Sequence, residues 1–163
     1  MRAKEKNPVR KGETPVQAGN RIAVGMLARR EHSRQEIGRK LGQRGLDEDV
    51  IEQVLAGLEA EGLLSEERFV EQFVYQRVNR GDGPMKIRLE LGRRGIDGEV
   101  VDIAIDAAEV DWQAQAESAR QKRFGREIPA EYSERAKQAR FLQGRGFGME
   151  QISRVLKGDL FEE

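Results

Sequence analysis

The sequence contains no cysteine, which excludes a disulfide framework, a thiolate zinc site and a cysteine nucleophile. Its single histidine, His32, leaves no histidine pair for a metal site. No run of about 18 apolar residues is present, and the first residues lack the apolar stretch of a signal peptide. We therefore expect a cytoplasmic protein with no membrane segment, no metal and no other cofactor.

Catalytic and nucleotide-binding motifs are also missing. The glycine-rich segments 42–45 and 144–148 lack the spacing of a G-x-x-x-x-G-K-[ST] phosphate loop, so they are interpreted as helix caps and turns. His32 has no nucleophile partner in a recognisable arrangement, which favours a surface or capping role. The acidic clusters at 47–49 and 66–67 fall in expected first helical turns, where the helix dipole favours carboxylates. We expect no catalytic residue, and hence no enzyme.

A threefold internal repeat is the main positive feature of the chain. The pattern L-x-x-R-G-[apolar] occurs at residues 41–46, 91–96 and 142–147. Its glycines, Gly45, Gly95 and Gly146, lie 50 and 51 residues apart, and apolar residues recur six and ten positions after each. Gln138 stands where the first two copies have isoleucine, so the third copy is the most divergent, as terminal repeats often are.

Each copy predicts three helices and no strand. The Arg-Gly pair is typical of a left-handed glycine cap at a helix end. Residues 33–36 have the pattern of a capping box. The pair Gly83-Pro84 is typical of a helix start with proline at the first position. The expected N-caps after the Arg-Gly turns are Asp47, Asp97 and Gly148. Further helices are expected at 21–30, 66–80 and 112–124.

The fold class predicted from this pattern is all-α, an elongated array of three tandem three-helix repeats. The repeats are expected at residues 19–64, 65–110 and 111–163, after a disordered basic segment at residues 1–18. Repeats of this size bury little core alone and are stabilised by stacking. A compact chain of this length has a radius of gyration of about 15 Å, so a larger scattering value would support the elongated array.

The net charge is zero, but basic and acidic residues are concentrated in alternating segments of the chain. Basic residues outnumber acidic ones seven to two over 21–44, six to two over 77–94 and eight to three over 120–145. Acidic residues dominate nine to one over 47–71 and seven to none over 97–117. In stacked repeats, equivalent helices share a surface, so we expect one basic and one acidic stripe.

The basic stripe is the candidate binding site, and arginine suits bidentate contact with phosphate or carboxylate. Three readings stay open: phosphate binding, an acidic protein surface, or neutralisation of acidic helices within the molecule. Few aromatic residues are available for base stacking, so sequence-specific readout is not predicted. The residues of the stripe are Arg29, Arg30, Arg34, Arg39, Lys40, Arg44, Arg77, Arg80, Lys86, Arg88, Arg93 and Arg94.

Three segments agree in order and spacing with one known family. They are LARREHSR at 27–34, GLLSEERF at 62–69 and GPMKIRLELGRRGI at 83–96. The chain resembles the RecX family of bacterial recombination regulators over roughly residues 18–158. Ser65 stands where that family often has aspartate, and either residue can cap a helix.

The resemblance implies an all-helical protein that binds the RecA nucleoprotein filament and restrains RecA recombinase and its coupled ATPase in DNA repair and the SOS response. It implies phosphate contacts with single-stranded and also double-stranded DNA, and we expect a monomer. Two alternatives remain. A general DNA-binding helical protein would bind naked DNA as well as RecA-coated DNA, and a protein-interaction scaffold would bind without nucleic acid.

Overall fold

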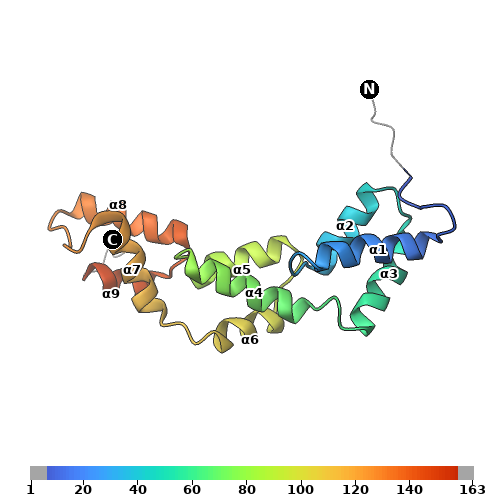
Figure 1. Cartoon of the computed structure of the whole chain (residues 1–163). Coiled ribbons are helices and arrows are strands. Elements are labelled where there is room, and N and C mark those ends of the chain that lie inside the picture. The colour runs from blue at the N-terminus through green and yellow to red at the C-terminus, as the bar shows by residue number, and fades with distance from the viewer. Residues whose placement is uncertain (1–6, 158–163) are drawn as a thin grey trace, which may run out of the picture. The chain divides into compact units, whose positions relative to one another are not determined.

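The computed structural model describes residues 7–157, and this range contains nine α-helices and no strand (Figure 1). The all-α class predicted from the repeats is therefore confirmed. The chain forms two compact units, residues 1–69 and 70–163.

The first unit holds helices α1 (Pro15–Leu27), α2 (Arg34–Gln43) and α3 (Glu48–Ala60). Their apolar faces meet in one core, as the repeat pattern predicts. Full burial of each aliphatic side chain there stabilises the fold by roughly 1.5–3 kcal/mol. The buried residues of this core are Ile22, Ala23, Ile37, Leu41, Leu46, Val54, Leu55, Leu58 and Leu64.

Helix α1 begins at Pro15 and ends at Leu27, whereas the sequence predicted a helix over 21–30. Thr14 Oγ1 accepts a hydrogen bond from the Gln17 amide at 3.2 Å, and Gln17 Oε1 accepts one from the Thr14 amide at 2.9 Å. This reciprocal capping box, with proline in the first turn, starts the helix early. The expected disorder of residues 1–18 is therefore wrong for residues 15–18, while residues 1–6 lie outside the described range.

Helix α4 (Glu66–Asn79) crosses the boundary between the units. The second unit continues with α5 (Pro84–Arg93), α6 (Glu99–Ala107), α7 (Trp112–Phe124), α8 (Tyr132–Arg145) and α9 (Met149–Leu156). Its core contains the apolar positions of the second and third repeats. Buried residues from α4 to α6 are Val70, Phe73, Val74, Ile87, Leu91, Ile96, Val101 and Ile105. A cluster from α7 to α9 contains Ala116, Ala119, Ala139, Leu142, Phe147, Ile152, Val155 and Leu156.

The repeat glycines end α2, α5 and α8 as predicted. Gly45, Gly95 and Gly146 have φ values of 91°, 77° and 94°, a left-handed conformation that glycine adopts without a Cβ clash. The predicted N-caps Asp47 and Gly148 are confirmed, although the Asp47 side chain makes no capping hydrogen bond. The prediction of Asp97 is wrong, because Gly98 at φ 71° takes the cap position and α6 begins at Glu99.

The end of α8 joins the start of α5 through the backbone. The Gly83 amide donates to the Arg145 carbonyl at 2.7 Å, and the Met85 amide donates to the Gly146 carbonyl at 3.0 Å. Amides at the start of a helix and carbonyls at its end have no partner within that helix. Here two amides at the start of α5 are paired with two carbonyls at the end of α8. A Cβ on Gly83 would lie 2.5 Å from the Gly146 carbonyl, so this seam requires glycine.

A polar pair explains why the third repeat breaks the apolar pattern. Gln138 is 4% exposed and occupies the position of Ile37 and Ile87. Its Oε1 accepts a hydrogen bond at 3.3 Å from Nη1 of Arg120, which is 1% exposed. Arg120 also donates to the carbonyls of Glu127 at 3.1 Å and Arg126 at 3.0 Å. The buried arginine therefore ties the loop between α7 and α8 to the core.

Candidate functional site

The twelve residues of the predicted basic stripe divide into two groups in the structure. Seven contact acidic or aromatic groups within their own unit: Arg30, Arg34, Lys40, Arg77, Lys86, Arg88 and Arg94. The other five are exposed, and their side chains form no hydrogen bond or ion pair with another described residue. These five, named here the free arginines, are Arg29, Arg39, Arg44, Arg80 and Arg93.

Glu36 gathers basic side chains in the first repeat. Its carboxylate lies 2.5 Å from Nη2 of Arg30, 3.4 Å from Nζ of Lys40 and 4.0 Å from Nε2 of His32. Burial opposes ionisation of Glu36, but hydrogen bonds and positive charge, chiefly from Arg30, lower its pKa from 4.5 to about 2. Only half of the predicted capping box forms: Ser33 Oγ accepts from the Glu36 amide at 3.1 Å, while the Glu36 carboxylate faces cations.

Arg34 joins the basic helix of the first repeat to its acidic helix. Nη2 lies 2.7 Å from Glu52 and Nε lies 2.6 Å from Glu59. Hydrogen bonds to these carboxylates raise the pKa of Arg34 and, at Glu52, lower the carboxyl pKa. In the second repeat, Arg88 pairs with Asp102 of α6 in the same way. For these arginines, neutralisation within the molecule is the observed role.

Asp82 is a second acidic centre, and it is completely buried at the start of α5. Its carboxylate lies 3.2 Å from Nζ of Lys86, 3.7 Å from Nη1 of Arg145 and 3.8 Å from Nη1 of Arg77. One carboxylate thus neutralises part of three positive charges from α4, α5 and α8. Asp82 was not predicted from the sequence, because a single aspartate between two basic helices gives no periodic signal.

The arginine of the L-x-x-R-G pattern has three different environments. Arg44 is exposed and belongs to the free arginines. The guanidinium carbon of Arg94 lies 4.8 Å from the centroid of the Phe73 ring, and Arg77 lies 4.6 Å from the same ring. Arg145 donates from Nη1 to the Arg80 carbonyl at 3.0 Å. The repeat therefore predicts the position of an arginine but not its partner.

His32 is 3% exposed, so of the two expected roles, surface or capping, the surface role is wrong. Its Nδ1 lies 3.0 Å from the Arg30 carbonyl, which can only accept, so Nδ1 carries the hydrogen. Burial lowers the pKa of His32 and favours the neutral ring at pH 7. The residue supports the turn that places Arg30 beside Glu36 and contacts no nucleophile.

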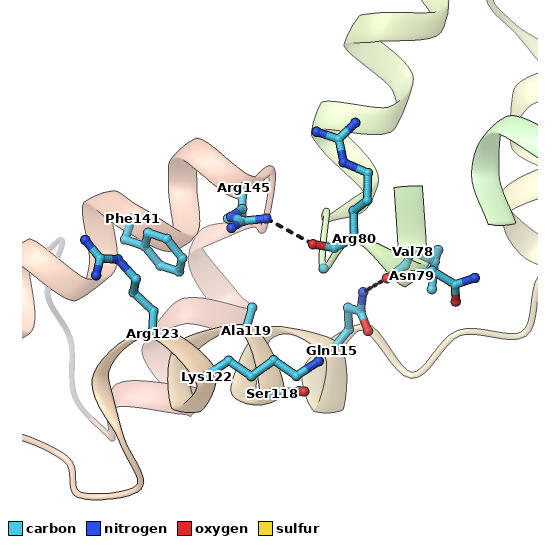
Figure 2. Close-up of a pocket in the computed structure, with 11 residues that line it drawn as sticks. Val78, Asn79, Arg80, Gln115, Ser118, Ala119, Lys122, Arg123, Phe141 and Arg145 are labelled. Carbon is cyan, nitrogen blue, oxygen red and sulfur yellow. Dashed lines mark hydrogen bonds between the residues drawn. The ribbon is translucent and has the colours of Figure 1, made fainter. Parts of the chain in front are cut away.

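A small basic pocket opens in the second unit, where the end of α4 meets α7 and α8 (Figure 2). Its volume is about 170 Å³. Four of the residues that line it are cationic, namely Arg80, Lys122, Arg123 and Arg145, and none is acidic. Of these, only Arg80 belongs to the predicted basic stripe, although the sequence shows a basic excess over residues 120–145.

Within residues 7–157, no three histidine, cysteine or acidic side chains gather as a metal site would require. The described helices include none with the length and apolar character needed to cross a membrane. What the geometry offers is a set of positive groups with hydrogen-bond donors, which can bind phosphate or carboxylate oxygens.

These features define an all-α protein of three-helix repeats with exposed arginines. Family models match all three repeats: the first three-helix domain of RecX at residues 21–58, the second at 65–105 and the third at 109–156. The chain belongs to the RecX family.

Relatives agree with this assignment, and a solved structure agrees with the fold. The chain is 49% identical to the regulatory protein RecX of Pseudomonas fluorescens (strain Pf-5), over 86% of this chain and 91% of that protein. It is 49% identical to the RecX of Halorhodospira halophila, over 80% and 81% of the two chains. The crystal structure of RecX from Lactobacillus salivarius matches with a TM-score of 0.75 at 21% identity, covering 88% and 95% of the chains, and so supports the fold.

Proposed function

We propose that this protein binds the RecA–single-stranded DNA filament and inhibits RecA recombinase and ATPase activity in recombination and repair. The observation that carries the proposal is the match of all three RecX domain models to the chain. The relatives are named regulatory proteins. In this proposal the protein acts in the cytoplasm as a monomer, without a cofactor and without catalysis of its own.

The free arginines are the part of the basic stripe best suited to this partner. They are exposed and have no carboxylate partner among the described residues, whereas Arg34 and Arg88 already pair with carboxylates. A nucleoprotein filament presents both phosphates and protein carboxylates, and guanidinium groups bind either in a bidentate manner. We therefore assign filament contact first to Arg39, Arg44 and Arg93, and not to the paired members of the stripe.

Binding to three targets tests the proposal: the RecA filament on single-stranded DNA, the naked strand, and RecA without DNA. We expect the filament to be bound more tightly than either component. Equal affinity for the naked strand would favour a general DNA-binding protein, and equal affinity for DNA-free RecA would favour a scaffold.

Charge variants test the assigned residues in the same assay. Substitution of Arg39, Arg44 and Arg93 by Gln should weaken filament binding and flatten its salt dependence, because fewer counterions are released. A control with the same charge change substitutes Arg126, Arg140 and Lys157 by Gln, all exposed, outside the predicted stripe and without an ion pair to a described residue. Equal loss in both variants would contradict the assignment of the free arginines.

A further inference from the structure

The basic pocket of the second unit contains more positive charge than the structure neutralises. Lys122 and Arg123 are exposed at the end of α7, and neither forms an ion pair with a described residue. Arg145 is the only one of the pocket's four cations near a carboxylate, Asp82, which Lys86 and Arg77 also approach. No acidic residue lines the pocket itself. The pocket is therefore a site of uncompensated positive charge.

Two of its arginines are held in place by aromatic rings. The guanidinium carbon of Arg145 lies 5.2 Å from the centroid of Phe141, and that of Arg123 lies 5.6 Å from the centroid of Phe124. The two rings pack edge to face, with centroids 5.2 Å apart. Arg145 is further fixed by its hydrogen bond to the Arg80 carbonyl, drawn in Figure 2. Groups that are ordered before binding lose less entropy when a ligand arrives.

The polar groups of the pocket suit an anion with several oxygens. Ser118 and Lys122 are four residues apart and share one face of α7, where they offer a hydroxyl and an ammonium group. Gln115 is already occupied, since its Nε2 donates to the Val78 carbonyl. The volume of about 170 Å³ is below the roughly 300–1,000 Å³ of pockets that enclose a whole small molecule. A single anionic group fits this space better than a complete nucleotide.

We propose that this pocket binds a phosphodiester group of a single-stranded nucleic acid, through Lys122, Arg123 and Arg145. The inference rests on the proposed function, and it adds to the candidate site three residues and the third repeat. A polyanion is favoured over an isolated carboxylate, because Arg80 also lines the pocket and its side chain leads away from Lys122 in Figure 2, which provides a further cation apart from Lys122. The next phosphate along a strand can use that cation.

The test uses a double variant, Lys122→Gln with Arg123→Gln, in the full-length protein. Both side chains are exposed, so the substitutions leave the helical content unchanged by circular dichroism. The control, Arg140→Gln with Lys157→Gln, makes the same charge change on exposed residues of the third repeat that do not line the pocket and form no ion pair with a described residue. Affinity for a fluorescent oligothymidylate is measured by anisotropy at several salt concentrations.

We expect the pocket variant to bind about tenfold more weakly at low salt, with a salt slope shallower by about 1.4, since two contacts at about 0.7 each are lost. The control should keep most of the wild-type slope. Unchanged binding by the pocket variant, equal loss in the control, or no oligonucleotide binding by the wild type would overturn the inference. The inference would also be overturned if the pocket variant lost its binding to a polyglutamate peptide but kept its binding to the oligonucleotide.

Inhibition of the RecA ATPase, measured on the same proteins, separates this inference from the proposed function. A wild-type protein that binds the oligonucleotide through the pocket but leaves RecA unaffected would refute the proposed function alone. A wild-type protein that inhibits RecA, with a pocket variant that binds the oligonucleotide normally, would refute the pocket alone.

Discussion

At the residue scale, the buried guanidinium of Arg120 is the least expected feature of the protein. Its charge has no carboxylate within ion-pair distance among the described residues, and its hydrogen bonds go to two loop carbonyls and Gln138. A buried polar group is tolerated when its partners are present and is costly when one is removed. Arg120 and Gln138 should therefore behave as a coupled pair.

Arg120→Leu should lower the free energy of unfolding of the second unit by about 2–4 kcal/mol, because three acceptors lose their donor. The double variant with Gln138→Leu should lose less than the sum of the single variants, since the first two repeats hold isoleucine at that position. Urea unfolding measures each value. Arg126→Leu, at an exposed side chain, serves as the control and should change stability by less than about 0.5 kcal/mol. Additive losses would show that the two residues act independently.

Glu36 gives a pH dependence whose sign follows from its pKa. The pKa of Glu36 falls from 4.5 to about 2 on folding, so the carboxylate stabilises the fold above pH 4.5. This contribution should be lost progressively as the pH falls from about 4.5 to about 2. Glu13, whose hydrogen bond from Arg21 also lowers its pKa to about 2, adds in the same direction.

Glu36→Gln should make the stability of the first unit less dependent on pH between 4.5 and 2, because the titrating group is gone. Urea midpoints at a series of pH values measure this slope. Glu71→Gln, at an exposed residue without an ion pair and beyond the first turn of its helix, should keep the wild-type profile. An unchanged slope in Glu36→Gln would place the acid sensitivity elsewhere.

The sequence shows which residues are basic, but it does not predict which of them lack a hydrogen-bond or ion-pair partner in the folded protein. Arg44, Arg94 and Arg145 occupy the same position of the repeat, yet their contacts differ. Those contacts depend on Phe73 of α4 and on Arg80 and Asp82 of the loop between α4 and α5. These partners approach the arginines only in the folded protein and have no fixed spacing from them in the sequence, so the local sequence pattern does not predict them.

At the element scale, helix number and type were predictable because apolar spacing and Arg-Gly caps agree in every repeat. Helix α7 begins and ends at the predicted residues, Trp112 and Phe124. Boundaries set by side-chain caps were less predictable, since Thr14 starts α1 early and Gly98 replaces Asp97. The contact between the end of α8 and the start of α5 joins segments about 60 residues apart, so no local pattern predicts it.

Gly83→Ala tests this seam. A Cβ there would lie 2.5 Å from the Gly146 carbonyl, although φ at Gly83 is −93°, which alanine adopts freely. The seam must open, and we expect a loss of about 1–3 kcal/mol in the free energy of unfolding. Gly148→Ala is the matched control, because Gly148 is also an N-cap and a Cβ on it would meet nothing closer than 3.8 Å. Equal losses in thermal unfolding would assign the effect to capping and not to the seam.

At the scale of the whole molecule, the numbers of positive and negative residues are equal, but only some of the positive residues pair with carboxylates. Carboxylates neutralise Arg30, Arg34 and Arg88 within their own repeats. The free arginines, and Lys122 and Arg123 of the pocket, have no carboxylate partner among the described residues. A chain with zero net charge can therefore bind a polyanion through local surfaces, with a salt dependence set by those surfaces alone.

The most direct test of the proposed function is the single-stranded-DNA-dependent ATPase of the cognate RecA, measured with increasing amounts of this protein. We predict inhibition at well below one copy per RecA, because a regulator bound to a filament affects many subunits. Added salt should relieve this inhibition if the arginines carry the contact. Full ATPase activity at equimolar protein, on filaments that the protein demonstrably binds, would contradict the account.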